Sequence, residues 1–156
     1  MIYIGIDPGA KGAMAMIYVD PDGREEVDIH PWDDDGFVTW IIGIRAVAKA
    51  GKEHIVAAVE KVGARPGQGV TSMFNFGKSA GYIEGVLSAL GIPYQLIPPA
   101  TWKREFSLIG KDKRASVEVC RKLFPDVDLK RTERCKTESD GKAESLLICE
   151  WARRKM

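Results

Sequence analysis

The stretch Ile2-Tyr3-Ile4-Gly5-Ile6-Asp7-Pro8-Gly9 decides the fold. Its first residues are mainly β-branched and aromatic, and a Pro-Gly pair follows, which is typical of a buried strand that runs into a turn. Asp7 is therefore expected at the C-terminal end of this strand. A carboxylate in such a buried neighbourhood is costly without a partner, so its place there points to a function.

Hydrophobic spacing and turn residues predict the remaining elements. Further strands are expected at 13–19, 25–30, 55–59 and 93–97. Helices are expected at 37–50, 70–90, 112–124 and 139–154, and a short helix is expected to begin at residue 100. This order predicts an α/β fold with one five-stranded mixed sheet and helices on both faces. In the second helix Gly77, Gly81 and Gly85 recur every four residues, and we expect them to let that helix approach the sheet closely.

Length and composition indicate one soluble domain spanning residues 1–156. No stretch approaches the roughly 20 consecutive apolar residues of a membrane-spanning helix, and the start has no basic leader. We therefore expect a cytoplasmic protein with no membrane partner. The three cysteines are odd in number and lack a C-x-x-C spacing, so reduced thiols are expected.

The net charge of +1 hides an uneven distribution along the chain. Residues 1–100 carry more acidic than basic side chains, whereas residues 101–136 hold 11 Lys and Arg against 6 Asp and Glu. A basic segment on an otherwise acidic domain predicts a face that binds a polyanion, although a solvated loop gives the same composition.

Four carboxylates are candidates for one site. Asp140 and Glu144 lie four apart on the expected last helix, where they share a face and repel unless the helix dipole or a cation offsets their charge. Glu60 ends an apolar strand, as Asp7 does. Strand ends and a helix start can converge, and four carboxylates suit Mg²⁺ or Mn²⁺. Two such ions about 4 Å apart support phosphodiester hydrolysis.

These acidic segments resemble the motifs of RuvC-type Holliday-junction resolvases in order and spacing. The matching segments are Ile4-Gly5-Ile6-Asp7-Pro8-Gly9, Ala58-Val59-Glu60-Lys61-Val62 and Asp140-Gly141-Lys142-Ala143-Glu144-Ser145-Leu146-Leu147. The segments Gly69 to Gly77 and Trp102-Lys103 through Lys111 to Lys113 are similar to the RuvC-like proteins of bacteriophages, so the resemblance covers nearly the whole chain. Bacterial members usually place the last two acids three apart and both as Asp, whereas this chain has Asp and Glu four apart.

The resemblance implies an RNase H-like fold, a homodimer and symmetric nicking of both strands at a four-way DNA junction. It also implies two Mg²⁺ or Mn²⁺ ions per active site and no nucleotide cofactor. By position, the catalytic and metal-binding acids would be Asp7, Glu60, Asp140 and Glu144. Lys103, with Lys111 or Lys113, corresponds to the basic residues near the scissile phosphate in the family.

Other residues are candidates for contact with DNA. Phosphate contacts position a substrate without reading its sequence, and the candidates for them are Lys103, Arg104, Lys111, Lys113 and Arg114. Arg65 and Gln68 lie in a loop rich in Gly and Pro and are further candidates. On the long helix, Met73, Phe74 and Phe76 fit a dimer contact, an aromatic inserted at the junction, or ordinary core. Two symmetric cuts by a chain with one site call for an isologous dimer.

Competing functions differ in how well the residues support them. An actin-like or sugar-kinase ATPase needs a second similar domain, and the chain has no phosphate-binding P-loop motif. A non-catalytic DNA-binding module explains the basic segment but not the carboxylates at two strand ends. A broader branched-DNA endonuclease that cuts three-way junctions, forks or flaps uses the same acids, as does an RNase H, and the sequence leaves these alternatives open.

Overall fold

The computed structural model describes residues 1–63, 67 and 69–156. Its centre is a five-stranded sheet with the strand order β3-β2-β1-β4-β5. The strands are β1 (Ile2–Asp7), β2 (Ala13–Val19), β3 (Glu25–Pro31), β4 (Ile55–Glu60) and β5 (Tyr94–Ile97). β1 is antiparallel to β2 and parallel to β4, so the sheet is mixed, and the predicted five-stranded mixed sheet is confirmed.

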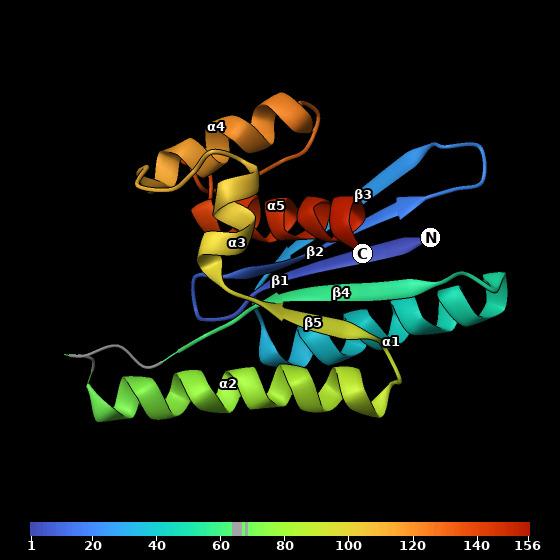
Figure 1. Ribbon diagram of the computed structural model, residues 1–156, viewed down its shortest axis with the longest axis horizontal. Coiled ribbons are helices and arrows are strands. Elements are labelled where there is room, and N and C mark those ends of the chain that lie inside the picture. The colour runs from blue at the N-terminus through green and yellow to red at the C-terminus, as the bar shows by residue number, and fades with distance from the viewer. Residues whose placement is uncertain (64–66, 68) are drawn as a thin grey trace.

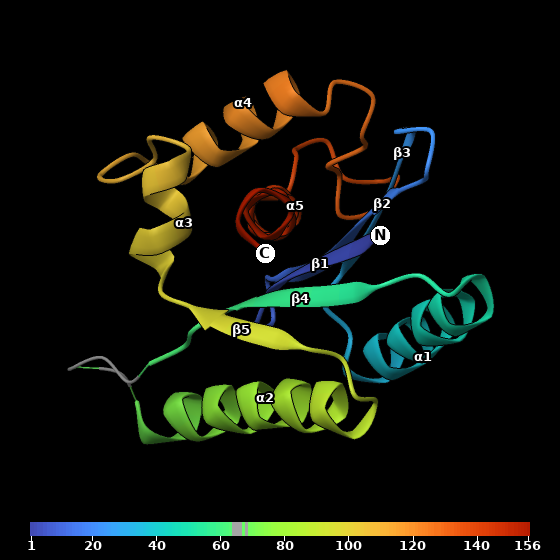
Figure 2. The same cartoon turned by 45° about the vertical axis from the view of Figure 1, so that its right-hand side comes forward.

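Helices cover both faces of the sheet, as the sequence predicts (Figure 1). One face carries α1 (Asp34–Gly51) and α2 (Val70–Ala89), and the other carries α3 (Pro99–Glu105), α4 (Lys113–Leu123) and α5 (Asp140–Lys155). Figure 2 shows α5 nearly end-on, lying between the sheet and α4. The α5 helix is therefore the layer that connects the sheet to the basic segment around α3 and α4.

Side-chain caps mark the starts of α1, α4 and α5. Ser139 caps α5, because its hydroxyl accepts a hydrogen bond from the backbone N–H of Lys142. Asp112 caps α4 in the same way. The α1 helix begins one turn earlier than the spacing predicts, because Asp33 caps it whereas its buried apolar residues begin only at Phe37. The spacing of apolar residues therefore does not predict the start of a helix whose first turn is exposed.

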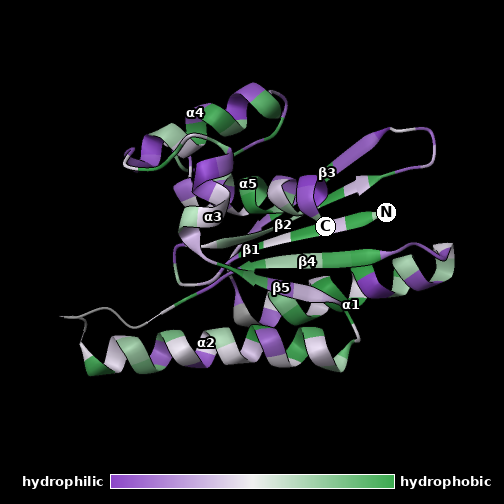
Figure 3. Ribbon diagram, in the orientation of Figure 1, coloured by the Kyte–Doolittle hydropathy of each residue, from purple (hydrophilic) through white to green (hydrophobic). Residues whose placement is uncertain are grey.

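Each face of the sheet has its own hydrophobic core. Phe37, Ile83 and Leu87 are fully buried under α1 and α2, while Trp102 and Leu146 are fully buried around α5. Burying one such side chain contributes about 1.5–3 kcal/mol. Figure 3 shows hydrophobic central strands and a hydrophilic edge strand β3. The central strands are therefore fixed from both sides, which holds their ends in place.

Two further sequence expectations concern cysteines and membranes. Cys120, Cys135 and Cys149 are all free thiols, so the expectation of reduced cysteines is confirmed. Among the described residues, no helix has the length and hydrophobicity needed to cross a lipid bilayer.

The α5 helix packs with its backbone directly against β1. A Cβ atom at Gly5 would overlap the carbonyl oxygen of Ser145 and the backbone nitrogen of Cys149. A Cβ atom at Gly141 would likewise overlap the carbonyl oxygen of Lys11, in the turn after β1. Only glycine fits at either position, so these two residues set the distance between α5 and the sheet.

The glycines of α2 do not face the sheet, and the expectation that they do is wrong. Gly77, Gly81 and Gly85 are exposed, and a Cβ atom at any of them would meet no other atom within 4 Å. Ile83 and Leu87 fill the side of α2 that faces the sheet. Because a helix turns about 100° per residue, the glycines fall on the opposite side. They form an exposed stripe instead of a close contact.

Gly5→Ala should destabilise the protein by about 1–3 kcal/mol or more, because the added methyl group meets backbone atoms of α5 that cannot rotate away. The measurement is the free energy of unfolding in urea. Gly43→Ala is the matched control, since Gly43 is exposed in α1 with no atom within 4 Å of a Cβ. The free energy of unfolding of this control should rise by about 0.5–1 kcal/mol, because alanine is more favourable than glycine inside a helix. Equal stability of Gly5→Ala and wild type would contradict the close packing of α5 on β1.

Candidate active site

Two of the predicted acids end neighbouring strands. Asp7 is the last residue of β1 and Glu60 is the last residue of β4. The two strands are parallel, with Ile6 opposite Val59, so their final carboxylates lie at the same edge of the sheet. In Figure 1 this is the end at which the arrowheads of β4 and β5 lie, next to α3.

The other two acids come from the start of α5. Asp140 is its first residue, and Glu144 lies one turn further on. The pKa of Asp7 is raised well above its usual value, first by burial and then by repulsion from Glu60 and Glu144, while Lys113 and Lys103 oppose the rise. Carboxylates from β1, β4 and α5 therefore share one electrostatic environment.

Two lysines pair with the acids of α5. The Nζ atom of Lys113 lies 2.9 Å from Oδ2 of Asp140, and the Nζ atom of Lys103 lies 3.5 Å from Oε1 of Glu144. Burial acts to raise the pKa of Asp140, but the hydrogen bond and charge of Lys113 outweigh it, so that the pKa is lowered. The same hydrogen bond raises the pKa of Lys113. Cations from α3 and α4 thus offset the repulsion that the spacing of the two acids predicts.

Two neutral side chains hold the remaining carboxylates. The indole Nε1–H of Trp102 donates a 2.7 Å hydrogen bond to Oε2 of Glu60. The hydroxyl of Ser116 donates a 3.3 Å hydrogen bond to Oε1 of Glu144. Trp102 is fully buried, and its hydrogen bond to Glu60 is not apparent from the sequence. Ser116 was also missed, although it follows Lys113 by three residues and so shares that face of α4.

The other predicted DNA contacts do not pair with the acids among the described residues. Lys111 and Arg114 are exposed, and neither forms an ion pair within residues 1–63, 67 and 69–156. Lys111 precedes α4 and Arg114 is the second residue of that helix, so both are accessible from solvent. Arg65 and Gln68 lie outside the described residues.

The aromatic residues of α2 differ in their surroundings. Phe74 is 72% exposed, so the alternative that it belongs to the core of its own chain is wrong. Phe76 instead approaches the turn after β1, where a Cβ atom at Gly9 would lie 3.4 Å from its ring. The N-terminal part of α2 therefore adjoins the end of the sheet that carries Asp7.

The donor set fits hard divalent cations by chemistry. Four carboxylates supply only oxygen ligands, which Mg²⁺ and Mn²⁺ prefer. Two ammonium groups cannot neutralise four ionised carboxylates, and burial together with repulsion from Glu60 and Glu144 raises the pKa of Asp7 despite both lysines. In the part of the chain that the structure describes, no three His, Cys, Asp or Glu residues are arranged to hold one ion. Lys103 and Lys113 hold Glu144 and Asp140 in ion pairs instead.

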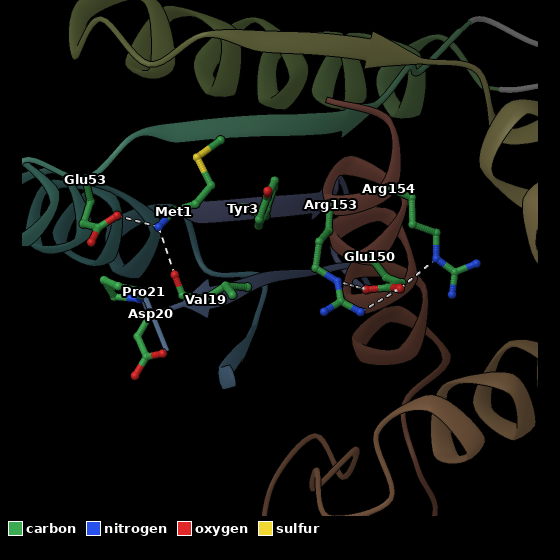
Figure 4. Close-up of a pocket in the computed structure, with 9 residues that line it drawn as sticks. All are labelled: Met1, Tyr3, Val19, Asp20, Pro21, Glu53, Glu150, Arg153 and Arg154. Carbon is green, nitrogen blue, oxygen red and sulfur yellow. Dashed lines mark hydrogen bonds and ion pairs between the residues drawn. The ribbon is translucent and has the colours of Figure 1, made fainter. Parts of the chain in front are cut away.

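A different pocket, of about 720 Å³, lies at the other end of α5 (Figure 4). Its lining residues are Met1, Tyr3, Val19, Asp20, Pro21, Glu53, Glu150, Arg153 and Arg154. The buried Glu150 accepts hydrogen bonds of 2.6 Å from Arg153 and 2.7 Å from Arg154. This charge cluster is paired within the chain, so it ties down the C-terminal end of α5 and offers no comparable site.

Solved structures with a similar fold include RuvC and a mitochondrial Holliday junction resolvase. The structure of Thermus thermophilus RuvC matches with a TM-score of 0.56 at 18% identity, covering 99% of this chain and 96% of that one. T. thermophilus RuvC in complex with a Holliday junction substrate matches with a TM-score of 0.59 at 15% identity, covering 99% and 97%. The yeast mitochondrial Holliday junction resolvase matches with a TM-score of 0.54 at 16% identity, covering 96% and 77%.

These matches show that the chain has the fold of RuvC-type resolvases, which the acidic motifs predict. No protein-family model matches the sequence. No curated protein is significantly similar to it. The likeness is therefore one of fold across nearly the whole chain, and the chemistry rests on the residues gathered at the end of the sheet.

Asp7→Asn should raise the melting temperature of the metal-free protein at pH 7. Because the pKa of Asp7 is raised in the folded state, ionised Asp7 lowers stability above that pKa, and this penalty disappears below its usual value of 3.8. We expect a gain of a few degrees at pH 7, since about 1 kcal/mol shifts the Tm of a chain of this size by ~2–4 °C. The gain should vanish as the pH falls towards 3.

Differential scanning calorimetry in EDTA across pH 3–8 measures this effect. Asp126→Asn serves as the control, because Asp126 is exposed and removal of its charge tests the general effect of one fewer carboxylate. If Asp7→Asn melts at or below the wild-type temperature at pH 7, burial and repulsion by the other acids do not penalise ionised Asp7 in the folded protein.

Proposed function

We propose that this chain is a divalent-metal-dependent endonuclease that resolves four-way DNA junctions by paired symmetric nicks. The observation that carries the proposal is the gathering of Asp7, Glu60, Asp140 and Glu144, with two lysines, at one end of the sheet. The fold supports it, because solved structures with this fold are RuvC and a mitochondrial Holliday junction resolvase, one of them bound to a Holliday junction substrate.

In this proposal the four carboxylates hold two Mg²⁺ or Mn²⁺ ions. When bound, such ions supply activation of the attacking water and stabilisation of the leaving oxygen in phosphodiester hydrolysis. The chain itself orients the ligands: the Trp102 indole fixes one oxygen of Glu60, and the Ser116 hydroxyl fixes one oxygen of Glu144. Held carboxylates lose less freedom when a cation binds, which favours binding.

The lysines have a second task in the proposed reaction. Lys103 and Lys113 lie within ion-pair distance of the acids, so they are positioned to hold the scissile phosphate beside the carboxylates. Without such cations the acid cluster would repel a polyanionic substrate. Lys111 and Arg114, exposed beside them, are proposed to contact flanking phosphates. Arg65 and Gln68 stay predicted DNA contacts.

The second half of the proposal is a homodimer formed through α2. The glycine stripe Gly77, Gly81 and Gly85 is exposed, and Val70 and Phe74 extend it as exposed apolar side chains. Small residues on a helix let a second helix approach closely, and an exposed apolar patch of this kind marks an interaction surface. A two-fold axis at this stripe gives the two active sites that paired nicks require.

Asp7→Asn should abolish cleavage while junction binding persists, because the substitution removes a metal ligand and leaves the basic residues in place. The measurement is a strand-resolved assay with Mg²⁺ or Mn²⁺ on matched four-way, three-way, flap and linear duplex DNA. We expect symmetric nicks confined to the four-way junction, and a loss of at least 10²-fold in rate for the variant, as for removal of a catalytic group.

The substrates and the metal dependence separate the alternatives. Comparable cutting of forks and flaps would identify a general branched-DNA nuclease that uses the same acids. Absence of cleavage by wild type on every substrate with either metal would overturn the enzyme proposal and leave a binding module. As an independent readout, Mg²⁺ or Mn²⁺ should raise the Tm of wild type and leave that of Asp7→Asn nearly unchanged.

Gly81→Glu should convert the proposed dimer into a monomer, because it places a charge in the middle of the glycine stripe. The fold should tolerate the change, since a Cβ atom at Gly81 meets nothing within 4 Å in its own chain. Sedimentation velocity measures the mass, and Gly43→Glu on the exposed side of α1 is the control. A variant that stays dimeric, or a wild type that is monomeric on junction DNA, would contradict an α2 interface.

A further inference from the structure

A pocket of about 350 Å³ lies beside Asp140, outside the groups used so far. It is formed by the turn between β1 and β2, by the segment that precedes α5, and by the first residue of α5. Its basic side chains are Lys11 and Arg131, and Thr137 and Ser139 add hydroxyl groups. Asp140 thus borders both this pocket and the acid cluster.

Buried polar contacts fix the segment that forms one wall. The Nζ atom of Lys142, a residue only 8% exposed, donates hydrogen bonds of 3.0 and 2.9 Å to the carbonyl oxygens of Asp128 and Lys130. Arg131 then reaches across and donates a 3.0 Å hydrogen bond to the carbonyl oxygen of Ala10. The wall is therefore tied both to α5 and to the turn opposite.

The position of Lys11 is fixed through its backbone. The start of α5 packs on its carbonyl oxygen, because Gly141 has no Cβ atom to keep the two apart. The side chain of Lys11 itself is exposed and lines the pocket. Lys11 therefore has a defined backbone position next to the first residue of α5, and its side chain lies at the pocket.

No acidic side chain among the described residues of the pocket balances the positive charges of Lys11 and Arg131. The two acids in its lining are already ion-paired with residues of α4: Glu138 with Arg121 at 2.7 Å, and Asp140 with Lys113 at 2.9 Å. Neither basic side chain of the pocket takes part in an ion pair among residues 1–63, 67 and 69–156. The guanidinium of Arg131 donates its hydrogen bond to a neutral carbonyl, which does not balance its charge. The pocket is therefore suited to an anion.

We propose that this pocket binds a backbone phosphate of the DNA strand next to the cleaved bond, with Lys11 and Arg131 as its contacts. This inference rests on the proposed nuclease function, which brings a polyanion to the neighbouring acids. Lys103 and Lys113 then hold the strand from the side of α3 and α4, while Lys11 and Arg131 hold it from the side of the β1–β2 turn. Contacts on both sides of the carboxylates fix the strand in place, as hydrolysis requires.

The salt dependence of binding tests the pocket. Lys11→Ala is made in the Asp7→Asn background, which cannot cleave in the proposal, and its affinity for a four-way junction is measured from 50 to 200 mM salt. Loss of one phosphate contact should reduce the slope of log K against log salt by about 0.9. Lys11→Arg should restore it. Lys49→Ala, which removes an exposed lysine from α1 on the other face of the sheet, should leave the slope unchanged.

A scan of uncharged methylphosphonate linkages then locates the contact. The substitution is placed at one linkage at a time along the strand beside the cut bond. At one position it should weaken junction binding by the Asp7→Asn protein. At that same position it should have little effect on binding by the protein that carries both Asp7→Asn and Lys11→Ala. The assignment would be overturned if Lys11→Ala and Lys49→Ala had equal slopes of log K against log salt. It would also be overturned if every methylphosphonate weakened binding equally with and without the Lys11 side chain. That failure differs from failure of the nuclease proposal, which appears as a wild-type protein that cuts no branched DNA.

Discussion

The backbone contact between α5 and β1 at Gly5 is the constraint on which the rest of the structure depends. Because position 5 carries no side chain, the helix lies directly on the middle of the sheet, between Ser145 and Cys149. Interiors are packed too tightly to absorb a displaced helix without rearrangement. Any side chain at this position would lift α5, and with it Asp140 and Glu144 in its first two turns, away from the ends of β1 and β4.

That packing concentrates negative charge at one end of the sheet. Lys103 and Lys113 offset part of it, but burial and repulsion from Glu60 and Glu144 still raise the pKa of Asp7. Such an arrangement lowers stability, so a fold keeps it where a cation or a reaction makes use of it. In the proposed reaction the same charge would repel DNA, and the basic side chains of α3 and α4, with Lys11 and Arg131 beside Asp140, would offset that repulsion.

Much of this was predictable from the sequence because it depends on local periodicity. The strands, most helix ends and the shared edge of Asp7 and Glu60 follow from alternation, caps and the rule that parallel strands end together. The prediction that the α2 glycines face the sheet was wrong, because a four-residue repeat shows that residues share one side of a helix. It does not show whether that side packs on the core or faces solvent. Contacts distant in sequence were missed: Trp102 and Glu60 are 42 residues apart, and Arg131 and Ala10 are 121 apart.

The α2 helix connects the two halves of the proposed function. Its exposed stripe around Gly81 lies opposite the sheet, while Phe76 near its N-terminal end touches the Gly9 turn that follows Asp7. In a dimer built on that stripe, one rigid element runs from the two-fold axis to the acid cluster in each chain. The distance between the two clusters would then be set by packed helices instead of by loops. A resolvase that nicks two strands at matching positions needs such a fixed separation, and this provides a structural reason for a glycine-rich outer face on an otherwise ordinary surface helix.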